Sequence, residues 1–248
     1  RDLLAGAQAV CVLSGAGVSA ESGVPTFRGE GGLWKNHAPE QLATPGAFRR
    51  DPRLVWEWYQ WRRDKISACD PNPGHRALAR FALGDREVRI VTQNVDGLHE
   101  AAAREEAGAK DPSPALPLEL HGSIFRVRCS RCAYSVPHRD PVQTASRDDL
   151  PRCPACSSLL RPAVVWFGES LDGEVLSQAF RGAQSSSVCL VVGTSALVHP
   201  AASVPLATQE AGGSILEVNP EETPLTRMAQ LSLRGASGEI LPRLLEGL

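Results

Sequence analysis

Short apolar runs recur along the chain, and each of them ends in small or polar residues. They cover residues 7–13, 88–92, 188–193 and 214–219. Continuous apolar runs of this length are typical of strands that are buried on both faces of a parallel sheet. Helical patterns lie between several of them, notably over 75–81 and 201–211. The alternation predicts an α/β fold, a Rossmann-like doubly wound parallel sheet in which ligands bind at the carboxyl ends of the strands.

Two stretches do not follow this alternation. Residues 29–70 are rich in Trp, Pro and Arg and contain one helical pattern over 54–66, and residues 126–160 carry two Cys-x-x-Cys pairs. We expect these stretches to be insertions that together form a smaller module, with a helical part over 29–78 and a four-cysteine zinc-binding part over 126–160. The Rossmann-like part then consists of residues 1–28, 79–125 and 161–248. Residues 104–117 have the composition of a flexible surface loop.

Length and charge restrict the classes of protein that fit. The chain of 248 residues is long enough to bury a substantial apolar core. Its formal net charge of -2 provides no overall basic field for nucleic acid or an acidic membrane surface. No apolar stretch approaches the roughly 18 residues that a membrane helix requires. We therefore expect no nucleic-acid partner and no membrane partner, and we expect a monomer.

Four of the seven cysteines form the two Cys-x-x-Cys pairs, which a 20-residue spacer separates: Cys129, Cys132, Cys153 and Cys156. Four thiolates at this spacing can close a tetrahedral shell around zinc and leave no open position for a catalytic water. The metal is therefore expected to be structural. Cys11 and Cys189 lie in apolar runs, where a thiol packs as a small hydrophobe. This cysteine usage is typical of a reducing compartment.

The first apolar run leads into a glycine-rich turn, GAGVSA, over residues 15–20. It matches G-x-G-x-x-A, in which a tight turn brings backbone N–H groups onto a pyrophosphate at a helix N-terminus. The usual dinucleotide-binding unit also requires a second strand that ends in Asp or Glu about 20 residues later. That position falls in residues 29–35, which have no strand signature. A hydride-transferring oxidoreductase is therefore disfavoured.

Taken together, the motifs of this chain resemble one family, the sirtuins, which are NAD-dependent protein-lysine deacylases. The motifs follow the family's order and cover essentially the whole chain. Besides the two cysteine pairs, they are GAGVSAESGVPTFRG (15–29), TQNVDGLH (92–99), LHGS (120–123), RPAVVWFGE (161–169), GTS (193–195) and VNPE (218–221). The resemblance implies NAD as a consumed co-substrate, one structural zinc ion, and acylated lysine in proteins or peptides as the substrate.

The resemblance also implies roles for individual residues. His121 matches the general base, which agrees with the ability of imidazole to accept a proton near neutral pH. The implied products are nicotinamide, free lysine and O-acyl-ADP-ribose. Gln93, Asn94 and Asp96 match the residues that hold the nicotinamide ribose and carboxamide, and Gly193, Ser195 and Asn219 match positions that line the adenosine half. All the residues that match the family's NAD site are Gly15, Ala16, Gly17, Ser19, Ala20, Thr26, Phe27, Arg28, Trp34, Gln93, Asn94, Val95, Asp96, Gly193, Thr194, Ser195, Asn219, Pro220, Glu221 and Ser237.

The helix expected over 54–66 bears on which acyl group is removed. It places Tyr59 and Arg62 at i and i+3, on one face. The pair resembles the YxxR motif of class III sirtuins, which remove succinyl, malonyl and glutaryl groups, and Thr26 is a second mark of that branch. Arginine can bind the terminal carboxylate of such a group through two hydrogen bonds. Without the family pattern, the aromatic residues of this helix fit core packing, and Arg62 fits a solvated face.

Residues 164–169 resemble the strand that pairs with an extended substrate peptide, which binds through main-chain hydrogen bonds. The matching substrate-binding residues are Val165, Trp166, Phe167, Gly168 and Glu169. The alternatives that stay open are a mainly deacetylating enzyme, a protein ADP-ribosyltransferase, and a zinc ribbon that binds nucleic acid or protein. The class III resemblance suggests a mitochondrial location, with the cytosol, the nucleus or a bacterial cytoplasm as alternatives.

Overall fold

The computed structural model describes residues 1–25 and 37–248. In these residues, a sheet of six parallel strands has the order β3-β2-β1-β7-β8-β9. Its strands are β1 (Ala9–Ser14), β2 (Glu87–Thr92), β3 (Leu118–Glu119), β7 (Val188–Val192), β8 (Ser214–Val218) and β9 (Leu231–Leu233). The order reverses between β1 and β7, which is the position where dinucleotides bind in folds of this topology. The predicted Rossmann-like fold is confirmed.

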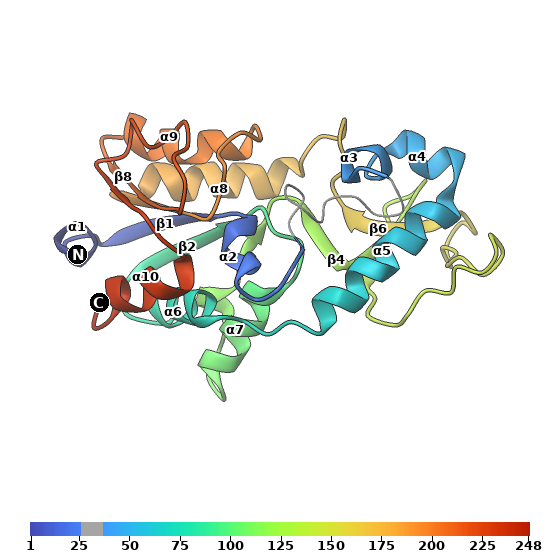
Figure 1. The fold of residues 1–248 in the computed structure, drawn as a ribbon, viewed down its shortest axis with the longest axis horizontal. Coiled ribbons are helices and arrows are strands. Elements are labelled where there is room, and N and C mark those ends of the chain that lie inside the picture. Colours follow the sequence, from blue (N-terminus) through green and yellow to red (C-terminus); the bar gives the residue numbers. More distant parts are fainter. Residues whose placement is uncertain (26–36) are drawn as a thin grey trace.

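Helices cover both faces of this sheet (Figure 1). On one face lie α8 (Gly173–Ser185) and α9 (Val204–Glu210), and on the other lie α6 (Pro73–Ala82), α7 (Leu98–Ala107) and α10 (Ser237–Leu245). Val10 and Val12 of β1 pack into the core that includes α6 and α10, whereas Cys11 and Leu13 pack into the core that includes α8 and α9. Burial on both faces explains why the run is continuously apolar. Cys11 and Cys189 are fully buried, as predicted.

A second, antiparallel sheet forms a smaller body beside the first (Figure 1). It consists of β4 (Gly122–Cys129), β5 (Ser135–Pro137) and β6 (Leu160–Val164), and it packs with α3 (Pro39–Leu42), α4 (Pro45–Arg50) and α5 (Pro52–Ser67). In the core of this body, Trp56 and Tyr59 of α5 cluster with Ile124 of β4. Strands β4 and β6 run across positions 125/126 and 160/161, where the sequence suggested that the zinc part begins and ends.

Local capping explains where α5 begins. Asp51 accepts a hydrogen bond from the backbone N–H of Leu54 at 3.0 Å, and Pro52 occupies the first helical position. Proline is favoured there because its missing N–H would have no intrahelical partner. The helix therefore starts two residues before the predicted 54–66. It ends after Ser67, one residue later than predicted.

Several elements differ from the sequence-based expectation. Residues 104–107 close α7 instead of opening a loop, and the helix ends at Gly108, which has a φ of +58°. Helices α8 and α10 and the edge strand β9 were not predicted. Short helical segments complete the set: α1 (Asp2–Ala5), α2 (Ala16–Ala20), η1 (Ser113–Ala115) and η2 (Ala201–Ser203). Among the helices that the structure describes, none is both long enough and apolar enough to cross a membrane.

Candidate active site

The turns that follow β1 and β7 are packed directly against each other. The N–H of Gly17 donates to the carbonyl oxygen of Gly193 at 2.8 Å. A Cβ on Gly15 would lie 2.6 Å from the Cβ of Thr194, and one on Gly17 would lie 2.8 Å from the Gly193 oxygen. The glycines are therefore required by the close approach of the two turns. The Gly17 N–H is therefore used within the protein, and pyrophosphate binding by other N–H groups of this turn stays a prediction.

The polar residues after β2 form hydrogen bonds to both of these turns. Gln93 donates from its side chain to Thr194 Oγ1 at 2.9 Å. Asn94 donates to the carbonyl oxygen of Gly15 and to Ser19 Oγ, both at 3.0 Å. Residues from three strand ends therefore meet where the strand order reverses, and they supply buried polar groups there. This arrangement fits a dinucleotide.

Asp96 is buried beneath the same turn. Its carboxylate accepts the N–H of Leu98 at 2.9 Å and also interacts with the Ser19 hydroxyl. Burial raises the pKa of Asp96, and these hydrogen bonds and the charge of Arg62 oppose the rise. Val95, between Asn94 and Asp96, is buried and directs its carbonyl oxygen to the N–H of Ile124 at 2.9 Å.

Two buried histidines that the sequence analysis did not single out lie behind these residues. His75 Nδ1 accepts the N–H of Asn72, so the ring proton lies on Nε2, which is 3.3 Å from Ser19 Oγ. His99 Nε2 lies 2.8 Å from Ser14 Oγ. Burial lowers the pKa of His75 to about 2 and that of His99 to about 4, so both rings are neutral. The usable signal was the Asn72-Pro73 helix start, which places His75 at the third helical position.

The turn after β8 is stabilised by a second group of residues that the sequence did not reveal. Glu217 is fully buried, and its carboxylate accepts hydrogen bonds from Thr226 at 2.7 Å, from Ser232 at 2.6 Å, and from Thr223. Arg234 lies 3.5 Å from this carboxylate. The residues that contact Glu217 lie after β8, in β9 and just after β9. Their spacing in the sequence follows no regular pattern, so it does not reveal these contacts.

Arg234 also reaches the predicted adenosine side of the site. It donates to the carbonyl oxygen of Glu221 at 2.6 Å, and Asn219 donates its side-chain amide to the same oxygen at 2.9 Å. Pro220 and Glu221 are exposed, and Ser195 is exposed at the end of β7. Ser237 is buried, and its hydroxyl donates to Glu21 at 2.7 Å. The Ser237 hydroxyl thus ties the start of α10 to Glu21, at the end of α2.

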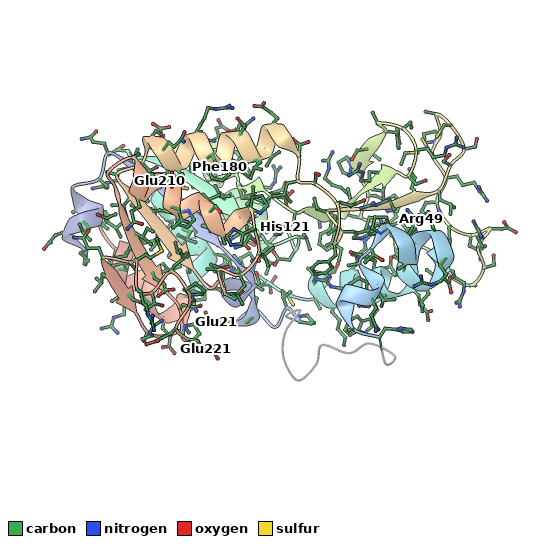
Figure 2. The ribbon with its side chains drawn as sticks, turned by 90° about the horizontal axis from the view of Figure 1, so that it is seen from above. Glu21, Arg49, His121, Phe180, Glu210 and Glu221 are labelled. Atoms are coloured by element: carbon green, nitrogen blue, oxygen red, sulfur yellow. The ribbon has the colours of Figure 1, made fainter. Side chains whose placement is uncertain are left out.

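His121 lies between the two bodies of the molecule (Figure 2). The neighbouring Gly122 has a φ of +74°, and a Cβ there would lie 2.1 Å from the carbonyl oxygen of Ala163, so only glycine fits. His121 Nδ1 lies 2.8 Å from the carbonyl oxygen of Gln93. A carbonyl can only accept, so Nδ1 carries the proton and Nε2 is left with a lone pair. Burial lowers the pKa of His121, which favours this neutral form.

Tyr59 and Arg62 are both buried on α5, with exposed fractions of 0% and 6%. The Tyr59 hydroxyl accepts a hydrogen bond from Trp166 Nε1 at 2.8 Å, and the Arg62 guanidinium lies 5.2 Å from the Trp58 ring centre. Burial lowers the pKa of Arg62, and Tyr59 and Asp96 oppose this change. The solvated-face interpretation of Arg62 is therefore wrong. Its guanidinium lies within electrostatic reach of Asp96, on the predicted nicotinamide side.

The strand expected over 164–169 is not formed beyond its first residue: the observed strand covers Leu160–Val164, and residues 165–169 are a turn and irregular chain. β6 ends at Val164, and Phe167 and Gly168 form a turn in which Gly168 has a φ of +85°. The Glu169 carboxylate accepts the N–H of Trp166 at 2.9 Å, which bends the chain back on itself. The N–H of Val165 donates to the His121 carbonyl oxygen at 2.9 Å. This turn therefore connects His121 to Trp166, the residue that contacts Tyr59.

The four cysteines of the two pairs come together at one end of the small sheet. Their sulfur atoms all lie within 4.8 Å of one another. Cys129 and Cys156 are 3.4 Å apart, and Cys132 and Cys153 are 3.6 Å apart. A tetrahedron with zinc–sulfur bonds of about 2.3 Å has edges of about 3.8 Å. The cluster therefore fits one structural zinc ion. The remaining predicted site residues, Thr26, Phe27, Arg28 and Trp34, lie outside the described residues.

The molecule combines a parallel sheet of the type that binds nucleotides with a small body that carries four clustered cysteines. His121 lies between the two. The Sir2 family model matches residues 15–200. The chain is 48% identical over 243 residues to an NAD-dependent protein deacylase of Pyrococcus abyssi, covering 97% of this chain and 93% of that protein. It is 49% identical over 250 residues to one of Thermococcus kodakarensis, covering 98% and 92%. The chain belongs to the Sir2 family.

Solved structures of the family superimpose closely. A Sir2 homologue in complex with NAD matches with a TM-score of 0.86 at 45% identity, covering 98% of this chain and 90% of that one. A Sir2 protein bound to an acetylated peptide matches with a TM-score of 0.82 at 30% identity, covering 99% and 95%.

Proposed function

We propose that this chain is an NAD-dependent protein-lysine deacylase that removes succinyl, malonyl and glutaryl groups from lysine faster than it removes acetyl groups. Membership of the Sir2 family and the names of its relatives support the deacylase activity. The arrangement at the strand ends supports NAD as the co-substrate, and the sulfur cluster supports one structural zinc ion.

NAD, when bound, would supply an electrophilic ribosyl carbon from which nicotinamide can leave. In this proposal, Gln93, Asn94 and Asp96 hold the nicotinamide half, and the Gly193–Ser195 turn and Asn219 hold the adenosine half. His121 Nε2 is the unprotonated imidazole nitrogen, and its role is to accept a proton from a ribose hydroxyl. The products of acyl transfer to that ribose are free lysine and O-acyl-ADP-ribose.

The acyl preference rests on one observation: Tyr59 and Arg62 are buried one turn apart on α5, beside the turn that is bonded to His121. A guanidinium stays charged at any pH of interest, and it can bind a carboxylate through two hydrogen bonds. A hydrogen bond to a charged group contributes about 1.5–3 kcal/mol. That corresponds to roughly ten- to hundredfold discrimination against acetyl, which ends in a methyl group.

Replacement of Arg62 tests this preference, and its neighbour offers the control. Arg63 is also buried, but its guanidinium contacts the backbone oxygen of His138 and lies 5.9 Å from the Phe125 ring centre. Arg62→Met is expected to lower kcat/KM for a succinyl-lysine peptide roughly ten- to hundredfold more than for the matched acetyl peptide. Arg63→Met should leave the ratio unchanged. Equal losses on both peptides in Arg62→Met would refute the acidic-acyl preference.

The relatives also bear on the cellular location. The mitochondrial expectation came from the class III motif, whereas relatives that are 48–49% identical to this chain are archaeal and bacterial. They give no support to a mitochondrial location.

A further inference from the structure

The indole of Trp166 is held from several sides. Its Nε1–H donates to the Tyr59 hydroxyl at 2.8 Å, across 107 residues of sequence. The Arg161 guanidinium lies 3.3 Å from the indole ring centre, and the Phe48 ring centre lies 5.4 Å away. Arg161 is itself fixed by two hydrogen bonds to Glu169, at 2.5 and 2.8 Å. The indole therefore has little freedom to rotate away from the phenol.

This hydrogen bond restricts what the phenol can do. A tyrosine hydroxyl has one proton to donate and an oxygen that accepts. In the part of the chain that the structure describes, Trp166 is the one side chain hydrogen-bonded to that hydroxyl, and it uses the oxygen as acceptor. Burial raises the pKa of Tyr59 to about 12, so the phenol keeps its proton. The phenol is left as a donor.

We propose that Trp166 is a specificity-positioning residue: its indole N–H orients the Tyr59 hydroxyl so that the phenol donates to the terminal carboxylate of the acyl group beside Arg62. The inference rests on the acidic-acyl preference proposed above and assigns a new residue to it. A carboxylate only accepts hydrogen bonds, so a phenol that only donates complements it. An acetyl group has no carboxylate at this position, so loss of the indole N–H should slow the removal of an acidic acyl group more than the removal of acetyl.

Two tryptophan variants separate this role from packing. Trp166→Phe keeps an aromatic ring next to Arg161 and removes the N–H. Trp56→Phe is the matched control, because Trp56 is also fully buried in the small body and donates its N–H to the carbonyl oxygen of Leu160 at 2.9 Å. Trp166→Phe should lower the ratio of kcat/KM for succinyl over acetyl peptides by about three- to tenfold, the usual effect of one neutral hydrogen bond. Trp56→Phe should leave the ratio unchanged.

A double-mutant cycle then tests whether Trp166 acts through Tyr59. In a Tyr59→Phe background, Trp166→Phe should have no further effect on the ratio, because the hydrogen bond is already absent. An undiminished effect in that background would overturn the proposal, and so would a ratio that Trp166→Phe does not change. If Trp166→Phe does not fold, a tryptophan analogue with sulfur in place of the ring N–H provides the same comparison with the ring shape kept.

The failure of this inference can be told apart from the failure of the proposed function. If the unmodified enzyme shows no preference for succinyl over acetyl, the acidic-acyl function is wrong, and the role of Trp166 is wrong with it. If the unmodified enzyme prefers succinyl and Arg62→Met removes that preference, the function is supported. An unchanged ratio in Trp166→Phe then overturns the role of Trp166 alone.

Discussion

The hydrogen bond between His121 Nδ1 and the Gln93 carbonyl determines which ring nitrogen is free, and burial lowers the pKa of the ring below the ordinary 6.5. A general base must be unprotonated, so activity should be lost only as the pH falls below that value. We expect the acid limb of kcat/KM to lie below about pH 6.5, with a plateau at neutral pH. A pH profile of deacylation from about pH 5 to about pH 8.5 measures this.

Glu119 provides the control for that profile. It lies two residues before His121, and burial raises its pKa to about 7. If the limb reports His121, Glu119→Gln should leave its position unchanged. A limb near pH 7 that disappears in Glu119→Gln would instead assign the titration to the carboxyl.

The buried His99 should make the free energy of unfolding depend on pH. Its pKa is about 4 in the folded chain and 6.5 ordinarily, so between these values the unfolded chain binds more protons. Stability should therefore fall as the pH is lowered from 6.5 towards 4, by up to about 1.4 kcal/mol per pH unit from this residue. In His99→Gln, which retains a polar partner for Ser14, the free energy of unfolding should fall less steeply. Parallel curves for the two proteins would contradict this.

The sequence singled out residues where they belong to local motifs. The spacing of the four cysteines predicted their cluster, which the structure forms, and the resemblance to family motifs pointed to His121 and to the Tyr59–Arg62 pair. The residues that orient them could not be located in this way, because their partners are distant: Trp166 reaches Tyr59 across 107 residues, and Ser14 reaches His99 across 85. Such contacts depend on sheet order and helix packing, which a local pattern does not contain.

The turn after β8 shows how one element can depend on a single buried side chain. Glu217 accepts three hydroxyl hydrogen bonds, and Arg234 connects it to the Glu221 carbonyl on the predicted adenosine side. Glu217→Gln should raise KM for NAD by about three- to tenfold, as expected for one or two weakened hydrogen bonds, with little change in KM for the acyl peptide. Steady-state kinetics in which NAD and the acyl peptide are varied separately measures the two KM values.

The exposed Glu210, at the end of α9, supplies the matched control for this element. Glu210→Gln makes the same chemical change without touching the turn, so both KM values should stay as they were. Equal increases in both KM values for Glu217→Gln would indicate a general loss of structure rather than a role at the adenosine side.

The helices and strands with the most continuous apolar patterns were predicted best. Strands β1, β2, β7 and β8 are buried on both faces, and their predicted boundaries fall within two residues of the observed ones. Helix α8 was missed because its fully buried residues are only Ala179 and Ala183, which give a weak signal. The small sheet was missed because β4 pairs with β6 across the whole cysteine segment.

At the scale of the molecule, the cysteine cluster and the proposed acyl site at Tyr59 and Arg62 lie in the same small body. Strand β4 ends at Cys129, and β6 leads into the turn that carries Trp166. Zinc removal should therefore abolish removal of acetyl and succinyl groups together, because the sheet that supports both loses its structural ion. Chelation should release about one zinc per chain, measured with a metal-binding dye.

A serine replacement tests the structural role of zinc without a chelator. Cys132→Ser should lose both zinc and activity, whereas Cys69→Ser should keep both, because Cys69 is a partly exposed thiol outside the cluster. Full activity in zinc-free protein would contradict a structural role for the metal.

The most direct test of the central claim is nicotinamide release by the unmodified enzyme, with and without NAD, on peptides of one sequence that carry acetyl-, malonyl-, succinyl- or glutaryl-lysine. We expect release that requires NAD, and a kcat/KM for the best acidic acyl group at least roughly tenfold above that for acetyl. Equal or greater efficiency on the acetyl peptide would contradict the proposed preference for acidic acyl groups, and the absence of NAD-dependent release on all four peptides would contradict the deacylase activity.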